Sequence, residues 1–198
     1  EVAKEACFAM HGGTAINLFV RNMPRLSVDI DLTYVEITGR TETLEAINAA
    51  LVRIKARIEG LRSSIRVLHK GALCKLQLDE RGAIIKIEVN MVGRGLLGEI
   101  SKVQLCEAAQ EKFDVFCTIS LVPMAQLYGG KLCAALDRQH PRDLFDVKLL
   151  LENEGITNEI KRGFIFGLVS SNRPTHELLD PHLLDQSTVF ENQFEGMS

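Results

Sequence analysis

The sequence predicts an α/β protein in which a strand-rich part comes first and a helical part follows. Residues 27–35 and 83–91 alternate between apolar and polar side chains, which is typical of half-buried strands. From Pro123 onward, the apolar residues recur at helical spacing instead. The change of period near residue 121 predicts a core of residues 1–121 and a helical C-terminal domain of residues 122–198.

The same patterns place the individual elements. Strands are expected at residues 6–10, 27–35, 64–69, 72–79, 83–91 and 113–121, and helices at residues 15–20, 43–59, 124–138, 141–153 and 157–170. Arg81-Gly82 is typical of a turn, so the strands on either side of it are expected to form a hairpin. Pro141 suits the first position of a helix, where its missing N–H is not needed.

Composition narrows the class of protein. The chain has 198 residues, 46% of them hydrophobic and 25% charged, which fits a globular protein with a sizeable core. Its net charge of −3 gives no global basic field of the kind that marks many nucleic-acid binders. The five cysteines form no C-x-x-C pair, which favours reduced thiols. Without a signal peptide or a membrane-spanning apolar run, we expect a cytoplasmic protein with no membrane partner.

Asp29 and Asp31 lie two residues apart on the predicted strand 27–35, so both carboxylates point from the same face. Their Cα atoms should be about 6.5–7 Å apart. At that spacing, two carboxylates can share Mg²⁺ or Mn²⁺, which prefer oxygen ligands. A solvated polar face on an edge strand would show the same D-x-D pattern, so the surrounding residues have to decide between the two.

The predicted strand 83–91 offers a third carboxylate. Its apolar residues alternate with Lys86, Glu88 and Asn90. If this strand lies beside strand 27–35 with its apolar face toward the same core, Glu88 sits beside the two aspartates. Three crowded carboxylates repel each other unless a cation compensates them, which favours a metal site. Asp79, at the end of the preceding strand, is the substitute candidate, and a solvated face is the alternative interpretation.

Gly12-Gly13-Thr14 joins the first predicted strand to a helix. Glycines at such a position let the backbone approach a ligand closely, and the free N–H groups at the start of a helix attract phosphate. A plain tight turn would use the same residues, so the motif alone does not distinguish a phosphate site from a turn.

Residues 123–151 contain a second group of charged candidates. Lys131 lies on an apolar stripe of its predicted helix, where a lysine must either extend to solvent or meet an anion such as a triphosphate. Asp143, in the first turn of the next helix, complements the helix dipole. Asp146 could pair with Arg142 and brace the two helices, so packing is the alternative role for these residues.

The order of these motifs resembles a known family. The motifs are GGT, R-x-S-x-D-x-D-L (Arg25 to Leu32), a strand carrying Glu88, G-K-L-x-A-x-x-x-R (Gly130 to Arg138) and R-D-x-x-D (Arg142 to Asp146). Together they are similar to the AbiEii/AbiGii-type nucleotidyltransferase toxins of bacterial toxin–antitoxin and phage abortive-infection systems. That family belongs to the polymerase-β-like nucleotidyltransferase superfamily. The resemblance covers residues 8–151, and Glu88 stands where the superfamily commonly has aspartate.

The resemblance implies a nucleotidyltransferase-fold α/β core with a mixed sheet, followed by a helical domain. It also implies the roles of the site residues. Nucleotide binding falls to Gly12, Gly13, Thr14, Ser27, Lys131 and Asp143, metal binding to Asp29, Asp31 and Glu88, and catalysis to Asp29, Asp31, Glu88, Lys131 and Asp146. Either Asp143 or Asp146 would be the acidic residue of the last motif, and the metal would be Mg²⁺ or Mn²⁺.

The implied reaction transfers NMP from an NTP to RNA, tRNA in particular, or to a protein side chain. A cognate antitoxin from a neighbouring gene is expected to restrain the toxin, with or without direct binding. Because the chain is acidic overall, an RNA acceptor would need a local basic patch, for which Arg21 and Arg25 are candidates. Arg25 is equally suited to brace the aspartate strand by pairing with an acidic neighbour.

Two other functions fit parts of the sequence. A catalytically inactive module of the same fold could bind a nucleotide or a partner, although the intact acidic set disfavours it. A phosphohydrolase with an aspartate nucleophile would also carry D-x-D, but at the end of its first strand. Here the pair follows a glycine turn and a helix, which disfavours that reaction.

Overall fold

The computed structural model describes residues 1–197 and confirms an α/β fold with a mixed sheet. Seven strands lie in the order β3-β4-β5-β2-β1-β7-β6. They are β1 (Phe8–His11), β2 (Ile30–Tyr34), β3 (Arg66–Lys70), β4 (Lys75–Glu80), β5 (Ala83–Arg94), β6 (Ser101–Gln104) and β7 (Thr118–Leu121). The pairs β2–β5 and β1–β7 are parallel, and the other neighbours are antiparallel.

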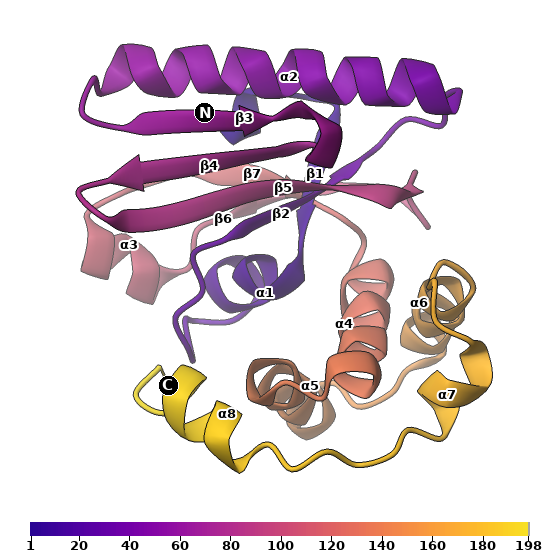
Figure 1. Cartoon of the computed structure of the whole chain (residues 1–198). Helices are drawn as coiled ribbons and strands as arrows, with labels where there is room; N and C mark the ends of the chain where they lie inside the picture. The colour runs from indigo at the N-terminus through magenta and orange to yellow at the C-terminus, as the bar shows by residue number, and fades with distance from the viewer. Residues whose placement is uncertain (198) are drawn as a thin grey trace.

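The helices lie on both sides of this sheet (Figure 1). They are α1 (Gly12–Ala15), which continues as the π-helix η2 (Ile16–Val20), α2 (Arg40–Leu61), α3 (Glu107–Phe113), α4 (Met124–Arg138), α5 (Pro141–Asn153), α6 (Asn158–Val169), α7 (Thr175–Leu179) and α8 (Ser187–Gln193), with 3₁₀ turns η1 (Val2–Lys4) and η3 (Gly71–Leu73). Helix α2 runs along one face, while α1 and α4 to α8 lie on the other side (Figure 1). Within residues 1–197, none of these helices combines the length and the apolar character needed to cross a membrane.

The core forms where α2 packs on the sheet. The buried stripe of α2 includes Ile47, Leu51 and Ile54, and the strands contribute Leu32 and Ile87 among others. Burying a large aliphatic side chain stabilises the folded state by roughly 1.5–3 kcal/mol. This apolar contact fixes which face of each strand points inward, and therefore turns the alternate polar residues of β2 and β5 to the opposite face.

The helical half is held together by unusually close packing of α4 against α6. A Cβ atom on Gly163 would lie 1.8 Å from the carbonyl oxygen of Ala125, and one on Gly129 would lie 2.1 Å from the carbonyl carbon of Gly163. Only glycine permits this backbone contact. The close approach fixes the orientation of α4 and with it the direction of Lys131.

Most predicted elements are confirmed. Helices are found at 124–138 and 141–153 as predicted, and Arg81 and Gly82 form the hairpin turn with φ of 54° and 87°. The predicted strand 113–121 is wrong in its first half. Residues 107–113 form α3, Asp114 ends that helix with φ of 49°, and the strand begins at Thr118. The apolar residues that suggested the longer strand, Val115 and Phe116, are exposed rather than packed in the sheet.

Candidate functional site

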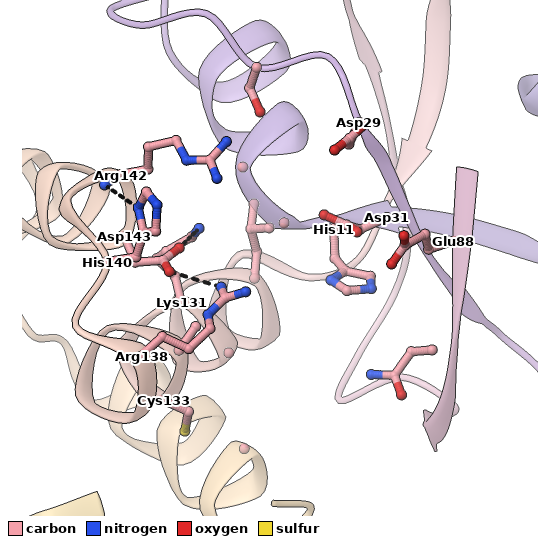
Figure 2. Close-up of a pocket in the computed structure, with 18 of the residues that line it drawn as sticks. His11, Asp29, Asp31, Glu88, Lys131, Cys133, Arg138, His140, Arg142 and Asp143 are labelled. Carbon is pink, nitrogen blue, oxygen red and sulfur yellow. Dashed lines mark hydrogen bonds and ion pairs between the residues drawn. The ribbon is translucent and has the colours of Figure 1, made fainter. Parts of the chain in front are cut away.

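A cleft of about 640 Å³ lies between the sheet and the helical half of the molecule. Its volume is typical of a small-molecule site. Most of the residues predicted for the site line it: Gly12, Gly13, Ser27, Asp29, Asp31, Glu88, Lys131 and Asp143. Thr14 and Asp146 are buried, with exposures of 5% and 0%. Figure 2 shows that the labelled side chains form two facing groups, acidic on the sheet and mainly basic on the helices.

The acidic wall comes from neighbouring strands. Asp31 on β2 lies in register with Glu88 on parallel β5 and with His11 on antiparallel β1. Asp29 accepts a hydrogen bond through Oδ1 from the Lys86 N–H at 3.0 Å. The expectation that strand 83–91 neighbours strand 27–35 is therefore confirmed from Ile30 onward, but the strand begins at Ile30, so Asp29 lies just before β2 and not on it as predicted. Asp79, the substitute candidate, instead accepts a hydrogen bond from the Gly82 N–H in the hairpin turn.

The electrostatics of this wall favour a bound cation. Burial raises the pKa of Asp31, and the nearby carboxylates of Glu88 and Asp29 act in the same direction, against His11 and Lys131. Burial also lowers the pKa of His11, whose Nε2 atom is enclosed and has no hydrogen-bond partner in the structure. A divalent cation between the aspartates would restore their preference for the ionised form.

The residues fit a hard cation at the aspartate pair, but the third ligand is elsewhere. Among residues 1–197, no three His, Cys, Asp or Glu side chains lie close enough to hold one ion. The Glu88 carboxylate forms an ion pair with Lys75 on β4. Asp29 and Asp31 supply the carboxylate oxygens that Mg²⁺ or Mn²⁺ prefers, whereas Glu88 is engaged by Lys75 through Oε1.

The glycine turn passes directly over the aspartates. A Cβ atom on Gly12, whose φ is +79°, would lie 2.3 Å from Oδ2 of Asp31, so no larger residue fits there. The hydroxyl of Thr14 donates to the carbonyl oxygen of Asp29, and it lies 3.0 Å from Oγ of Ser27. Thr14 thus anchors the segment that carries Ser27 and Asp29, while Gly12 and Gly13 remain at the cleft surface.

Of the two alternatives for Lys131, extension to solvent or contact with an anion, the structure shows the second, but the anion belongs to the protein. Its Nζ lies 2.7 Å from Oδ1 of Asp143 and 3.1 Å from Oδ2 of Asp146. Arg138 reaches the other oxygen of Asp143 at 2.8 Å. Burial alone would raise the pKa of Asp143, but Lys131 and Arg138 outweigh burial and lower it. The lysine is therefore fixed in place at the edge of the cleft rather than extended to solvent.

Asp146 forms the centre of a buried ion pair with Arg25. Arg25 donates from Nε to Oδ1 at 2.8 Å and from Nη2 to Oδ2 at 2.6 Å, and Asn17 donates to Oδ1 at 3.0 Å. The predicted pairing of Asp146 with Arg142 is wrong, because Arg25 from the loop before β2 occupies that position. Arg25 is 3% exposed, so it braces the aspartate strand and cannot serve as an RNA contact.

Arg21, the other RNA candidate, also contacts the protein itself. It pairs with Glu154, and its guanidinium lies 5.8 Å from the centre of the Tyr128 ring. Both arginines near the aspartate strand therefore attach the N-terminal half to the helical half.

Almost the whole sequence of the chain matches the profile of one protein family. The sequence profile described as "Nucleotidyl transferase AbiEii toxin, Type IV TA system" matches residues 1–196. The chain belongs to the AbiEii nucleotidyltransferase toxin family. The resemblance indicated by the motifs is thus confirmed, and the match extends beyond residues 8–151 to almost the whole chain.

The fold of this AbiEii-family chain is similar to that of a mycobacterial toxin of known structure. This toxin is MenT4, a nucleotidyltransferase toxin from Mycobacterium tuberculosis H37Rv, and the match has a TM-score of 0.67 and 15% sequence identity. The similarity covers 90% of this chain and 64% of MenT4, so the chain spans about two thirds of that protein. At this identity the similarity supports the fold. No curated protein sequence matches the chain.

The cleft residues of this AbiEii-family chain that were not candidates from the sequence include His11, Arg138 and His140. His11 directly precedes Gly12 and therefore lies opposite Asp31 across the β1–β2 ladder. That placement could have been predicted only after the antiparallel pairing was known. Arg138 is the last residue of the G-K-L-x-A-x-x-x-R motif, so its position about two turns beyond Lys131 on the same helix was a usable signal.

Proposed function

We propose that this chain catalyses metal-dependent transfer of a nucleoside monophosphate from an NTP to an acceptor hydroxyl, as the toxin of a type IV toxin–antitoxin system. The observation that carries the proposal is the arrangement of the cleft. The carboxylates of Asp29 and Asp31 face the cations of Lys131, Arg138 and Arg142 across it. A metal-bound triphosphate has the charge distribution that such facing walls complement.

Each group of residues in the cleft has a separate proposed role in the transfer. Asp29 and Asp31 would hold Mg²⁺ or Mn²⁺, which supplies positive charge to the triphosphate oxygens. Gly12, Gly13 and Ser27 present backbone and hydroxyl donors at the turn above the aspartates. Lys131, fixed by Asp143, stabilises the charge that develops as the bond between the α-phosphorus and pyrophosphate breaks.

Glu88 is our candidate for the base. The acceptor oxygen forms the new bond to the α-phosphorus, and its proton passes to the Glu88 carboxylate. Pyrophosphate is the leaving group. This role requires a Glu88 oxygen that is not engaged by Lys75, its partner in the structure.

The two acidic residues of the last motif differ in access. Asp143 lines the cleft, whereas Asp146 is fully buried beneath Arg25 and Lys131. We therefore assign Asp143 to the nucleotide side of the site. We assign Asp146 a positioning role through Lys131 and Arg25 rather than a contact with the substrate.

Family membership supports a proposal for the acceptor and the biology. We propose RNA, tRNA in particular, or a protein side chain as acceptor, a cytoplasmic site of action, and restraint by an antitoxin from a neighbouring gene. The test is incubation with each labelled NTP, Mg²⁺ and total cell RNA, followed by gel separation of RNA from protein. Label should enter one of these fractions with the wild type, and no label should enter either with Asp29→Ala.

A nucleotide-binding module without turnover is the second candidate. It is favoured by one observation, the ion pair that holds Glu88 on Lys75. The labelling experiment separates the two, because the module would bind an NTP by calorimetry and yet label no acceptor. Growth arrest on induced expression of the wild type, but not of Asp29→Ala, would further support the toxin.

A further inference from the structure

One row of ionisable side chains crosses five strands on the face of the sheet opposite α2. The strand registers place Lys70 beside Lys75, Lys75 beside Glu88, Glu88 beside Asp31, and Asp31 beside His11. Residues in register point to the same face of a sheet. The row is therefore basic on β3 and β4 and acidic on β5 and β2, where it enters the cleft.

The basic end of the row is an open surface continuous with the cleft. Helix α2 packs on the other face of β3, β4 and β5 (Figure 1), while Arg66, Leu68 and Ile84 on this face are exposed. The cleft extends along β5 over Lys86 and Asn90. A molecule lying on these strands could thus reach the aspartate pair without crossing the helical wall, where the phosphates of the NTP are proposed to bind.

The charge of this surface indicates which kind of molecule it would bind. Arg66, Lys70, Lys75 and Lys86 supply four positive charges, against Asp79 and Glu88, although the chain as a whole carries −3. A local basic strip on an acidic protein suits a polyanion such as RNA. A protein acceptor would not be attracted by charge in the same way.

Lys75 is the residue at which this strip meets the site. Its ammonium pairs with Glu88, with side-chain exposures of 20% for Lys75 and 42% for Glu88. Both groups can therefore exchange partners without unfolding. The Lys75 ammonium and a cation at Asp29 and Asp31 are both positive and draw on the same Glu88 carboxylate, so each weakens the hold of the other.

We propose that Lys75 is a positioning residue that couples acceptor binding to the metal site. A phosphate of a polyanionic acceptor lying on β3 and β4 draws Lys75 away from Glu88, and the freed carboxylate turns to the cation and the acceptor hydroxyl. The metal site is complete only when an acceptor is present, which protects the NTP from reaction with water. This coupling rests on the proposed function, and its test separates the two.

The experiment measures the affinity of the NTP-free protein for a short fluorescent single-stranded RNA by anisotropy, with and without Mn²⁺. Divalent cations ordinarily weaken RNA binding by competing for phosphates. Coupling reverses the sign, because each ligand must strengthen the other by the same factor. A half-exposed ion pair is weak, so Mn²⁺ should tighten RNA binding by up to about fivefold.

Three variants make the test specific. Lys75→Met should bind Mn²⁺ more tightly than the wild type, and Mn²⁺ should now weaken its RNA binding. Glu88→Gln should also lose the Mn²⁺-dependent tightening. Lys102→Met is the matched control, since Lys102 is exposed on β6 at the other edge of the sheet, and it should behave as the wild type.

The outcomes are decisive in both directions. Weakening of RNA binding by Mn²⁺ in the wild type, to the same extent as in Lys75→Met, overturns the coupling, as does a transfer assay that labels only protein. Mn²⁺ binding that is unaffected by Asp31→Asn would instead overturn the proposed function. In turnover, Lys75→Met should raise KM for the RNA several-fold with kcat almost unchanged, whereas a purely structural defect would lower kcat.

Discussion

The two walls of the cleft carry carboxylates in opposite electrostatic surroundings. On the sheet wall, burial and the neighbouring carboxylates raise the pKa of Asp31. On the helical wall, Lys131 and Arg138 lower the pKa of Asp143 despite its burial. On the sheet wall, Lys75 pairs with Glu88, but no ion pair to Asp29 or Asp31 is formed among the described residues, whereas Lys131, Arg138 and Arg25 pair with the acids of the second wall.

This difference in charge compensation distinguishes the acids that stabilise the fold from the acids that are proposed to bind a ligand. Buried acids with protein cations around them, as at Asp146, hold the two halves of the molecule in one orientation. A half-buried acid whose pKa is raised despite His11 and Lys131, as at Asp31, destabilises the protein in its ionised form unless a ligand compensates it. The contrast supports the proposed cation site at Asp29 and Asp31, and each of the following predictions challenges one side of it.

The largest effect is expected at the sheet wall. Asp29→Ala or Asp31→Ala should lower transfer by on the order of 1,000-fold or more, because each removes a proposed metal ligand. The fold should survive, and metal-free Asp31→Ala should be at least as stable as the wild type, since a buried like charge is removed. Labelled-NTP transfer and urea denaturation measure the two quantities. Asp180→Ala, an exposed acid beyond α7, is the control and should remain active.

At the helical wall, the corresponding change should affect stability instead. Arg25→Met leaves Asp146 without its bidentate partner, and breaking a buried pair in this way destabilises by about 3–5 kcal/mol. Urea denaturation should show this loss. The double variant Arg25→Met/Asp146→Leu should recover most of it, because no uncompensated charge remains. A single variant as stable as the wild type would show that the pair contributes nothing to holding the two halves together.

The contrast also explains what the sequence could predict. The alternation around Asp29 and Asp31 and the helical spacing around Lys131 are local patterns, so the fold class, helices α4 and α5 and most cleft residues could be placed. The partner of Asp146 could not, because Arg25 lies 121 residues away and reaches it only through the packing of α1 on α5. The pairing of Glu88 with Lys75 likewise depends on strand register rather than on spacing along the chain.

A smaller effect is expected for Lys131. It lies on the helical wall, but it is proposed to contact the same triphosphate as the metal at the sheet wall. Lys131→Met should weaken NTP binding by about 1–3 kcal/mol, the range for a lost charge-assisted contact. Calorimetry in the presence of Mg²⁺ measures this. Lys148→Met, on the exposed side of α5, is the control and should bind NTP normally. Unchanged affinity in Lys131→Met would mean that the lysine serves only Asp143 and Asp146.

The smallest effect concerns pH and distinguishes the walls in the intact protein. Since the folded-state pKa of Asp143 is lowered, its ionised form stabilises the protein above the unfolded-state value near 3.8, and this stabilisation is lost as pH falls through the folded-state pKa. The slope for one proton cannot exceed about 1.4 kcal/mol per pH unit. The free energy of unfolding of wild type and Asp143→Asn, measured in urea from pH 7 to pH 3, should therefore converge below about pH 4.

Asp31→Asn should differ from the wild type in the opposite sense at neutral pH in metal-free buffer, because the raised pKa of Asp31 makes its ionised form destabilising. If both variants lost stability at neutral pH, the two walls would not differ in charge compensation, and the cation site at Asp29 and Asp31 would lose its electrostatic basis.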